Sequence, residues 1–340
     1  MSGDITLPYS PKFLTVYAES VRSLQALSSL LNGWAFRGQS NSNWQLVPTL
    51  ERAIGNASLS NSVTIEHAIH RAFIRRAHHL LEHPPSYNDL FEWFSLIQHY
   101  GGPTRLLDFT RSFYVASFFA INPESKDESA VWAVNLRHLA ISFLKNTDVP
   151  TWEKGDFIHD LNPRIWGEYD SGKDKRILET IEEIKTEINN IKNKEKTHST
   201  VTGLLHGPIK IDRWLMTRAS NYNLKIVIPA EPSRISERMA AQQGLFLIAS
   251  TTNEKFINLL SKTLGFKKFF WKDRLIKTLR GVPRNIDMYH DASIIKVIIP
   301  LTIKAQIREE LRKMNINYAT LFPDLTGYAR SLYDYVDTIR

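Results

Sequence analysis

Residues 90–121 read LFEWFSLIQHYGGPTRLLDFTRSFYVASFFAI, with two apolar segments on either side of a short strand. The first segment is apolar nearly all round, which is typical of a buried helix. The glycine-glycine-proline sequence at 101–103 ends it. Residues 105–110 then predict a strand, and residues 113–121 predict a second buried helix. The strand AVWAVNL at 130–136 completes a β–α–β unit around a glycine turn.

Outward from this unit, hydrophobic periodicity predicts further helices and strands. The helices fall at 11–31, 63–83, 253–264, 303–315 and 324–339, and the strands at 34–39, 224–229, 244–250 and 293–300. Strands and helices mix without strict alternation, so the sequence predicts an α+β fold. We expect a small mixed or antiparallel β core surrounded by helices.

The segment 173–197 differs from the rest of the chain because a narrow row of isoleucines runs through it. Ile177, Ile181, Ile184, Ile188 and Ile191 are spaced like a coiled-coil seam of about two heptads. We interpret residues 150–215 as a helical insertion or arm, with a protein partner on this seam as the alternative. Residues 1–149 and 216–340 are then expected to form one α+β domain together.

Composition narrows the classes of function. The 340 residues contain 43 Lys and Arg against 35 Asp and Glu, a net charge of +8, and no Cys. Without Cys there is no disulfide, thiolate zinc site or cysteine nucleophile. No apolar run reaches the roughly 18 residues of a membrane span, and the first residues have no export signal. We expect a cytoplasmic protein, and the positive charge makes a polyanionic partner a hypothesis.

The first polar cluster is Phe36-Arg37-Gly38-Gln39. An arginine at a strand end presents its guanidinium fork to a phosphate or carboxylate, and a neighbouring glycine lets a ligand approach the backbone. A surface arginine before a turn gives the same pattern. The cluster therefore leaves both interpretations open.

The second cluster surrounds the glycine turn within residues 98–110. His99 is a candidate acid or base, and Thr104 and Arg105 follow the turn, where Arg105 could clamp an anion. Asp108 follows two leucines, so its burial would require a partner such as Arg105, Arg37 or His99. The alternative is a structural ion pair that fixes the turn.

The third cluster precedes the strand at 244–250. It contains Arg234, Arg238, Gln242 and Gln243, whose amides can read a base edge or a ribose by hydrogen bonds. We expect one polar cleft between the sheet and the 89–100 helix. The residues expected to converge there are Arg37, His99, Arg105, Asp108 and Gln243.

The order FRGQ, W-x-L-x-P-x-L and QHYGGPTRLLDFT resembles the bacterial FRG domain family, clearly over 34–120 and more loosely over 234–331. A second resemblance is to arginine–serine–glutamate ADP-ribosyltransferases. Phe36-Arg37-Gly38 is similar to their phosphate-binding strand, and Thr110-Arg111-Ser112 to their second element. Their Glu-x-Glu motif is missing, since Gln242 and Gln243 stand before the strand instead.

That second resemblance implies an ADP-ribosyltransferase-like core, NAD as the cofactor, and roles for particular residues. The cofactor would contact Arg37, Gly38, Gln39, Thr104, Arg105, Thr110 and Ser112, and the catalytic candidates are His99, Asp108 and Gln243. The function implied is an NAD-using effector that modifies a macromolecule, in a toxin or anti-phage defence role. The alternatives are a non-catalytic module that senses a nucleotide or nucleic acid, and a structural subunit of a defence complex.

Two further sequence patterns are typical of ligand sites. Residues 265–280 combine cations with aromatics, as single-strand binders do, or as a basic amphipathic helix does. The candidate nucleic-acid contacts there are Lys267, Lys268, Lys272 and Arg274. His79 and His83 are four residues apart on one predicted helix, but arginines surround them, so we expect a solvated face and no metal site.

Overall fold

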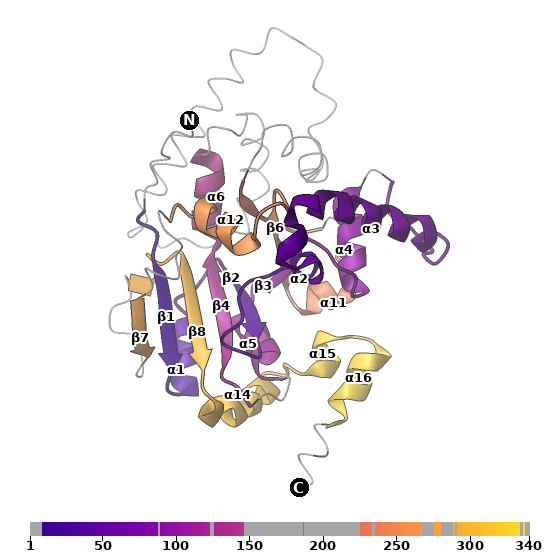
Figure 1. Ribbon diagram of the computed structural model, residues 1–340. Coiled ribbons are helices and arrows are strands. Elements are labelled where there is room, and N and C mark those ends of the chain that lie inside the picture. The colour runs from indigo at the N-terminus through magenta and orange to yellow at the C-terminus, as the bar shows by residue number, and fades with distance from the viewer. Residues whose placement is uncertain are drawn as a thin grey trace.

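The computed structural model describes residues 9–87, 89–122, 126–145, 186, 225–232, 235–266, 275–279, 288–289, 291–333 and 336. Their centre is one eight-stranded sheet in the order β5-β6-β3-β2-β4-β8-β1-β7 (Figure 1). In that order the strands are Val227–Ala230, Gly244–Ala249, Leu106–Thr110, Trp34–Gln39, Ser129–Asn135, Ile294–Ile299, Phe13–Ala18 and Leu275–Leu279. The mixed α+β fold that the sequence predicts is confirmed.

The sheet is antiparallel from β5 to β8 and parallel from β8 through β1 to β7. Strands that precede the segment 146–224 and strands that follow it are interleaved in this one sheet. The predicted helical insertion and the isoleucine row lie outside the described residues, apart from Thr186. The basic candidates at 267, 268, 272 and 274 also lie outside them.

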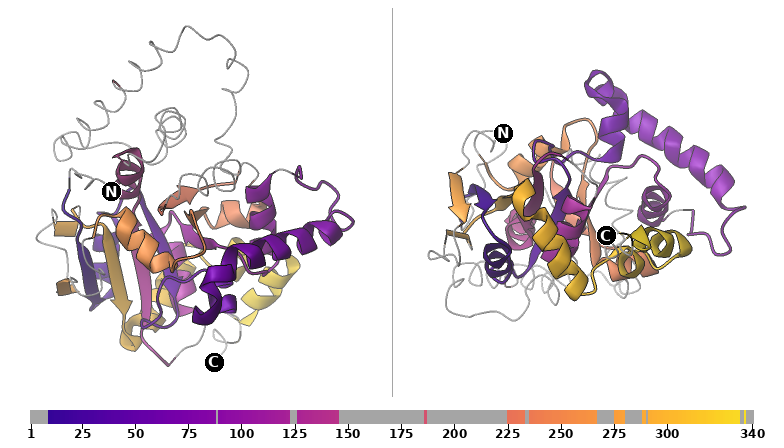
Figure 2. Two further views of the ribbon diagram at one scale, coloured as in Figure 1. Left: turned by 45° about the horizontal axis from the view of Figure 1, so that its top comes forward. Right: turned by 90° about the horizontal axis from the view of Figure 1, so that it is seen from below.

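Helices cover both faces of the sheet, each over its own apolar cluster (Figures 1 and 2). One face packs against α1 (Val21–Ser28), α5 (Phe113–Ile121), α14 (Leu301–Lys313) and α15 (Tyr318–Leu321). The other packs against α4 (Leu90–His99), α6 (Leu136–Lys145) and α12 (Phe256–Thr263). Apolar burial on both faces is the main stabilising contribution of such a three-layer arrangement.

Beside the sheet lie α2 (Thr49–Ile54), the short 3-10 helix η1 (Asn56–Asn61) and α3 (Ser62–Ala77), followed by α4. Trp93 of α4 is buried against Ile74 and Ala77 of α3. Two short helices complete this side of the chain, α11 (Glu237–Ala241) and α16 (Leu325–Ser331). Within the described residues no helix has both the length and the apolar character needed to cross a membrane.

The predicted helix over 11–31 is wrong for nearly its first half, residues 11–20. Residues 13–18 form β1, and the helix begins only after Ser20, whose side chain accepts a hydrogen bond from the Ser23 amide in a capping box. Five of the six β1 residues are buried because β1 lies between two parallel strands. Such a strand is apolar throughout and lacks alternation, so it matches a helical period by accident.

Candidate functional site

The strands β2 and β3 separate just where the Phe-Arg-Gly motif lies. Their pairing consists of a single position, Phe36 opposite Thr110. Immediately beyond it, Arg37 Nη1 donates a hydrogen bond to the backbone carbonyl of Asp108 at 2.7 Å. The guanidinium therefore bridges the two strands at the point where their backbone ladder ends, and it is only partly exposed.

Asp108 lies beside this arginine but turns its carboxylate towards solvent. Its side chain is 55% exposed, and Oδ2 is 3.7 Å from Arg37 Nη1. Gln98 Nε2 donates to the same oxygen at 2.8 Å. The carboxylate is thus held by two elements, β2 and α4, and still has access to water.

Two threonines fix the amide of Gln98 in this orientation. Thr104 Oγ1 donates to Gln98 Oε1 at 2.6 Å, and Thr49 Oγ1 donates to it at 3.3 Å. Since its oxygen accepts from hydroxyls, the amide nitrogen must face Asp108. Thr104, which the resemblance assigned to the cofactor, is buried and supports this network from below.

The guanidinium of Arg37 has an unmet hydrogen-bond donor and a second positive charge nearby. Its Nε is buried and has no hydrogen-bond partner among the described residues. Burial lowers the pKa of Arg37; Asp108 opposes that shift, and the nearby positive charge of Arg52 adds to it. Arg52 itself is exposed, and its Nη1 donates to the carbonyl of Val47. Unmade hydrogen bonds at a buried donor cost free energy, so an anion beside Arg37 would be favourable.

Arg105 does not join this site. Its guanidinium forms a buried, two-pronged ion pair with Glu66 of α3, through Nε at 2.7 Å and through Nη2. Nη1 donates to the carbonyls of Ala249 and Ser250 at 3.3 and 3.2 Å. The guanidinium that we expected to bind an anion is therefore bonded to protein groups. Its contacts link α3 to β3 and β6.

Gly38 and Gln39 serve the packing of β2. A Cβ at Gly38 would be 2.0 Å from the carbonyl oxygen of Ala116 in α5, so helix backbone occupies the space that we had expected a ligand to use. Gln39 is buried, donates to the carbonyl of Gln45 at 3.0 Å and accepts from Trp132 Nε1 at 2.7 Å. Both ends of its amide are therefore partnered.

Thr110 and Ser112, from the second element of the transferase resemblance, also bond to protein groups. Thr110 Oγ1 donates to the carbonyl of Gln242 at 2.7 Å, and Ser112 caps α5 by accepting from the Val115 amide. Gln243 is exposed and has a left-handed φ of 48°, with its carbonyl accepting from the Arg111 amide. No described contact links Gln243 to Arg37 or Asp108.

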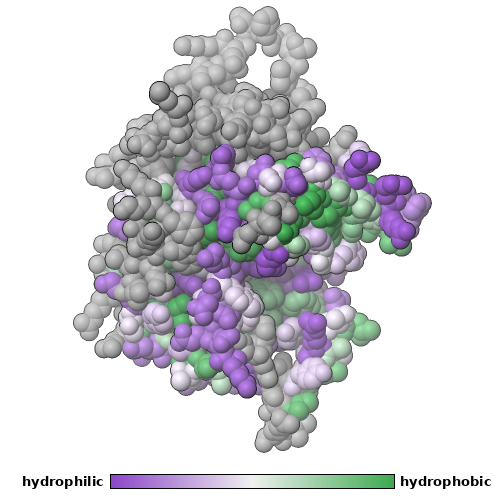
Figure 3. All heavy atoms as spheres, in the orientation of Figure 1, coloured by the Kyte–Doolittle hydropathy of each residue, from purple (hydrophilic) through white to green (hydrophobic). Residues whose placement is uncertain are grey.

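His99 lies at the exposed end of α4, in a different cluster. Partial desolvation lowers the pKa of its imidazole; the positive charge of Arg238 adds to this effect, and Asp324 opposes it. The guanidinium of Arg238 lies over the ring of Phe322 at 4.4 Å. His99 thus lies near α11 and the loop before α16, and the structure does not record a contact between it and Asp108. The space-filling view shows the surface hollowed between the α2–α4 region and α15–α16 (Figure 3).

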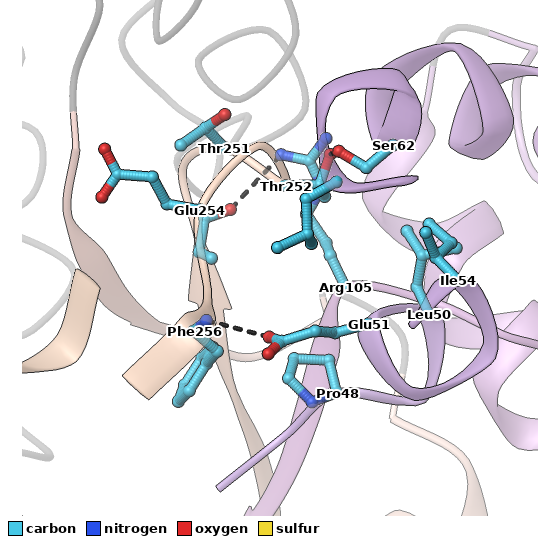
Figure 4. Close-up of a pocket in the computed structure, with 12 residues that line it drawn as sticks. Pro48, Leu50, Glu51, Ile54, Ser62, Arg105, Thr251, Thr252, Glu254 and Phe256 are labelled. Atoms are coloured by element: carbon cyan, nitrogen blue, oxygen red, sulfur yellow. Dashed lines mark hydrogen bonds between the residues drawn. The ribbon is translucent and has the colours of Figure 1, made fainter. Parts of the chain in front are cut away.

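Arg105 also lines a small pocket, together with residues of α2 (Figure 4). The pocket has an empty volume of about 300 Å³, its open mouth included. Burial raises the pKa of Glu51, the largest influence on this carboxyl, while the amide of Phe256 donates to it at 2.9 Å. Ser62 donates to Thr252 at 2.8 Å, and Glu254 pairs with two lysines. Since these polar groups already have protein partners, the pocket is a poor candidate for a polar ligand.

Sequence reasoning missed four residues that build these networks: Gln98, Thr49, Arg52 and Glu66. Gln98 stood in the quoted motif without a role, and Thr49 and Arg52 are distant from it in sequence. Glu66 carries a usable signal, because it falls at helical spacing from Ile74 and Ala77 on the buried face of α3. An acid on such a face requires a buried cation as its partner.

The fold and site thus define a broad class only: an α+β protein with a mixed sheet and a solvent-accessible arginine–carboxylate pair where two strands separate. Comparison with protein families is more specific, since residues 32–129 match the FRG domain. The match runs from the residues before β2 to the first residue of β4, and Arg37, Gln98 and Asp108 all lie within it.

No curated protein and no solved structure matches the chain. The resemblance to arginine–serine–glutamate ADP-ribosyltransferases therefore has no counterpart in these comparisons. Among the described residues there is also no group of three or more side chains suited to hold a metal ion.

Proposed function

We propose that this protein binds a phosphate-bearing nucleotide at the Arg37–Asp108 site and acts as a binding module. The observation that carries this proposal is the unpartnered, buried Nε of Arg37 beside the positive charge of Arg52. A phosphate accepts hydrogen bonds from a guanidinium fork, and its negative charge balances the two positive charges of Arg37 and Arg52, of which Asp108 offsets only one. The exposed carboxylate of Asp108 remains available to accept hydrogen bonds from ribose hydroxyl or base amino donors.

A non-catalytic role is supported by the contacts of the residues assigned to NAD chemistry. Gln39, Arg105, Thr110 and Ser112 all direct their polar groups to protein partners. A group that stabilises a transition state must touch the reacting atoms, and these groups are already occupied. The site therefore offers strong anion recognition with few groups left for chemistry.

The test is a calorimetric titration with ADP, NAD and uncharged adenosine. We expect binding of the two phosphate-bearing ligands and none of adenosine. Arg37→Ala should weaken binding by about 10- to 100-fold, the equivalent of one lost charge-assisted interaction. Arg22→Ala is the matched control, since it removes an exposed arginine from α1 on the opposite face of the sheet. Equal loss in both variants, or binding of adenosine as tight as that of ADP, would contradict the proposal.

ADP-ribosyl transfer remains the second candidate function because a carboxylate, Asp108, lies 3.7 Å from the proposed phosphate anchor and is open to solvent. Such a carboxylate could steady the positive charge that develops as the nicotinamide bond breaks. Nicotinamide release from NAD in the presence of cell lysate and nucleic acid tests it. Release that is lost in Asp108→Asn, with ADP affinity retained, would support transfer; binding without release would support the module.

A further inference from the structure

The outer face of α3 is a row of unpaired arginines. This sixteen-residue helix extends away from the sheet and its covering helices (Figure 2), and hydrophilic residues gather over its outer end (Figure 3). Arg71, Arg75 and Arg76 are all exposed. No side-chain hydrogen bond or ion pair joins any of the three to another residue that the structure describes.

Negative charge is absent from this face of α3. The helix contains one acid, Glu66, which is 2% exposed and paired with Arg105 on the inner side. Arg71 and Arg75 are one turn apart and point in nearly the same direction, and Arg76 lies about a quarter turn further round the helix from Arg75. His67 continues the row one turn earlier, and His79 follows in the turn after the helix ends at Ala77; both are exposed. From residue 67 to residue 75 the row is roughly 12 Å long.

The helix dipole explains only part of this arrangement. Cations in the last turn of a helix stabilise it by about 0.3–1 kcal/mol, and Arg75 and Arg76 occupy that turn. Arg71 lies a full turn earlier, and neighbouring arginines repel each other. An ordinary exposed helix would relieve that repulsion with acids four residues away, and α3 has none on this face.

We propose that the outer face of α3 binds the phosphate backbone of nucleic acid. A linear row of arginines on a protruding helix complements a linear row of phosphates, and the net charge of +8 favours the encounter. Arginine is suited to this contact because its planar fork binds phosphate oxygens in pairs. The proposed contacts are all to phosphates, which carry no sequence information, so the recognition is independent of sequence. This surface is separate from the Arg37 site, which takes a small nucleotide.

The experiment uses the full chain and a labelled DNA duplex of roughly 20 base pairs, with single-stranded DNA of the same length in a second arm. Fluorescence anisotropy is measured between about 50 and 200 mM salt. Arg71, Arg75 and Arg76 are replaced together by alanine, which has a high helix propensity and so keeps the helix. The matched control, Lys12, Lys262 and Lys313 all replaced by alanine, removes the same charge from residues that form surface ion pairs.

We expect the arginine variant to bind the duplex about tenfold or more weakly. The slope of log affinity against log salt should fall by about 2.7 for the duplex and about 2.1 for the single strand, the release expected from three phosphates. The lysine variant should retain most of the slope. An unchanged slope in the arginine variant, an equal loss in the lysine variant, or no binding by the wild type at the lowest salt would each overturn the proposal. So would tighter binding to anionic lipid vesicles than to either nucleic acid. Loss of ADP binding at Arg37 would leave this result unaffected.

Discussion

The buried pair of Arg105 and Glu66 gives the sharpest test of the site assignment. Arg105 is 4% exposed and Glu66 is 2% exposed, so each is compensated almost wholly by the other. Replacing either one by methionine leaves a buried, unpaired charge, which costs about 3–5 kcal/mol. Replacing both removes the two charges together, and the remaining loss is the pair of bonds from Arg105 to the carbonyls of Ala249 and Ser250, about 1–3 kcal/mol.

Urea unfolding measures these losses in unfolding free energy, with the fluorescence of the buried Trp93 and Trp132 as the signal. At a slope of about 3 kcal/mol per molar urea, each single variant should unfold roughly 1–2 M earlier than the wild type. The double variant should unfold later than either single variant. At low urea Arg105→Met should still bind ADP within about twofold of the wild type. An Arg105→Met protein of wild-type stability that no longer binds ADP would refute the structural role and restore Arg105 as a ligand group.

Two further perturbations follow from the packing. Gly38→Ala should lower the unfolding free energy by about 3 kcal/mol, because its Cβ would meet the Ala116 carbonyl oxygen at 2.0 Å. The nearby Ser40→Ala should change it by less than about 0.5 kcal/mol. The urea midpoints of the two variants check this, and equal midpoints would contradict it. Burial, helped by the charge of Arg137, lowers the pKa of His138 from 6.5 to about 3. Since the imidazole is neutral in the folded protein but takes up a proton in the unfolded chain, stability should fall as the pH drops from about 6.5 towards 3, by up to about 1.4 kcal/mol per unit. His138→Phe keeps a ring to stack on Tyr9 and should flatten that part of the pH profile of the urea midpoint; an unchanged profile would contradict the assignment.

Local sequence was sufficient for elements whose burial pattern matches their period. The helix predicted at 113–121 and the strand predicted at 244–250 agree with α5 and β6 to within a residue. The strand β7 was not predicted, because the stretch 265–280 had been interpreted as a basic helix or a single-strand binder. Both β1 and β7 depend on pairing with strands far away in sequence, and that information is absent from a local window.

The candidate site was predictable in its members but only partly in its pairings. Arg37 stood among three possible partners of Asp108, and the sequence could not choose between them. The choice depends on where β2 and β3 separate, which is a property of the sheet register. The partner of Arg105 lies 39 residues earlier, on α3, so only the burial of Glu66 could have indicated it.

The arginines of the FRG segment show that environment, more than residue type, decides what each of them does. Arg105 is buried and directs its guanidinium to Glu66 and to two backbone carbonyls, so it holds β3 against α3. Arg37 is half-buried with a donor unmet, which suits a small anion. The arginines of α3 are exposed and have no side-chain hydrogen bond or ion pair with another described residue, which suits a long polyanion that covers several of them. These roles are linked through Glu66, because the residue that neutralises Arg105 also fixes the helix whose opposite face carries Arg71. Weakening the buried pair should therefore loosen the arginine-bearing face of α3 before it affects the Arg37 site, since Arg37 is anchored to β3 by its own bond to the Asp108 carbonyl.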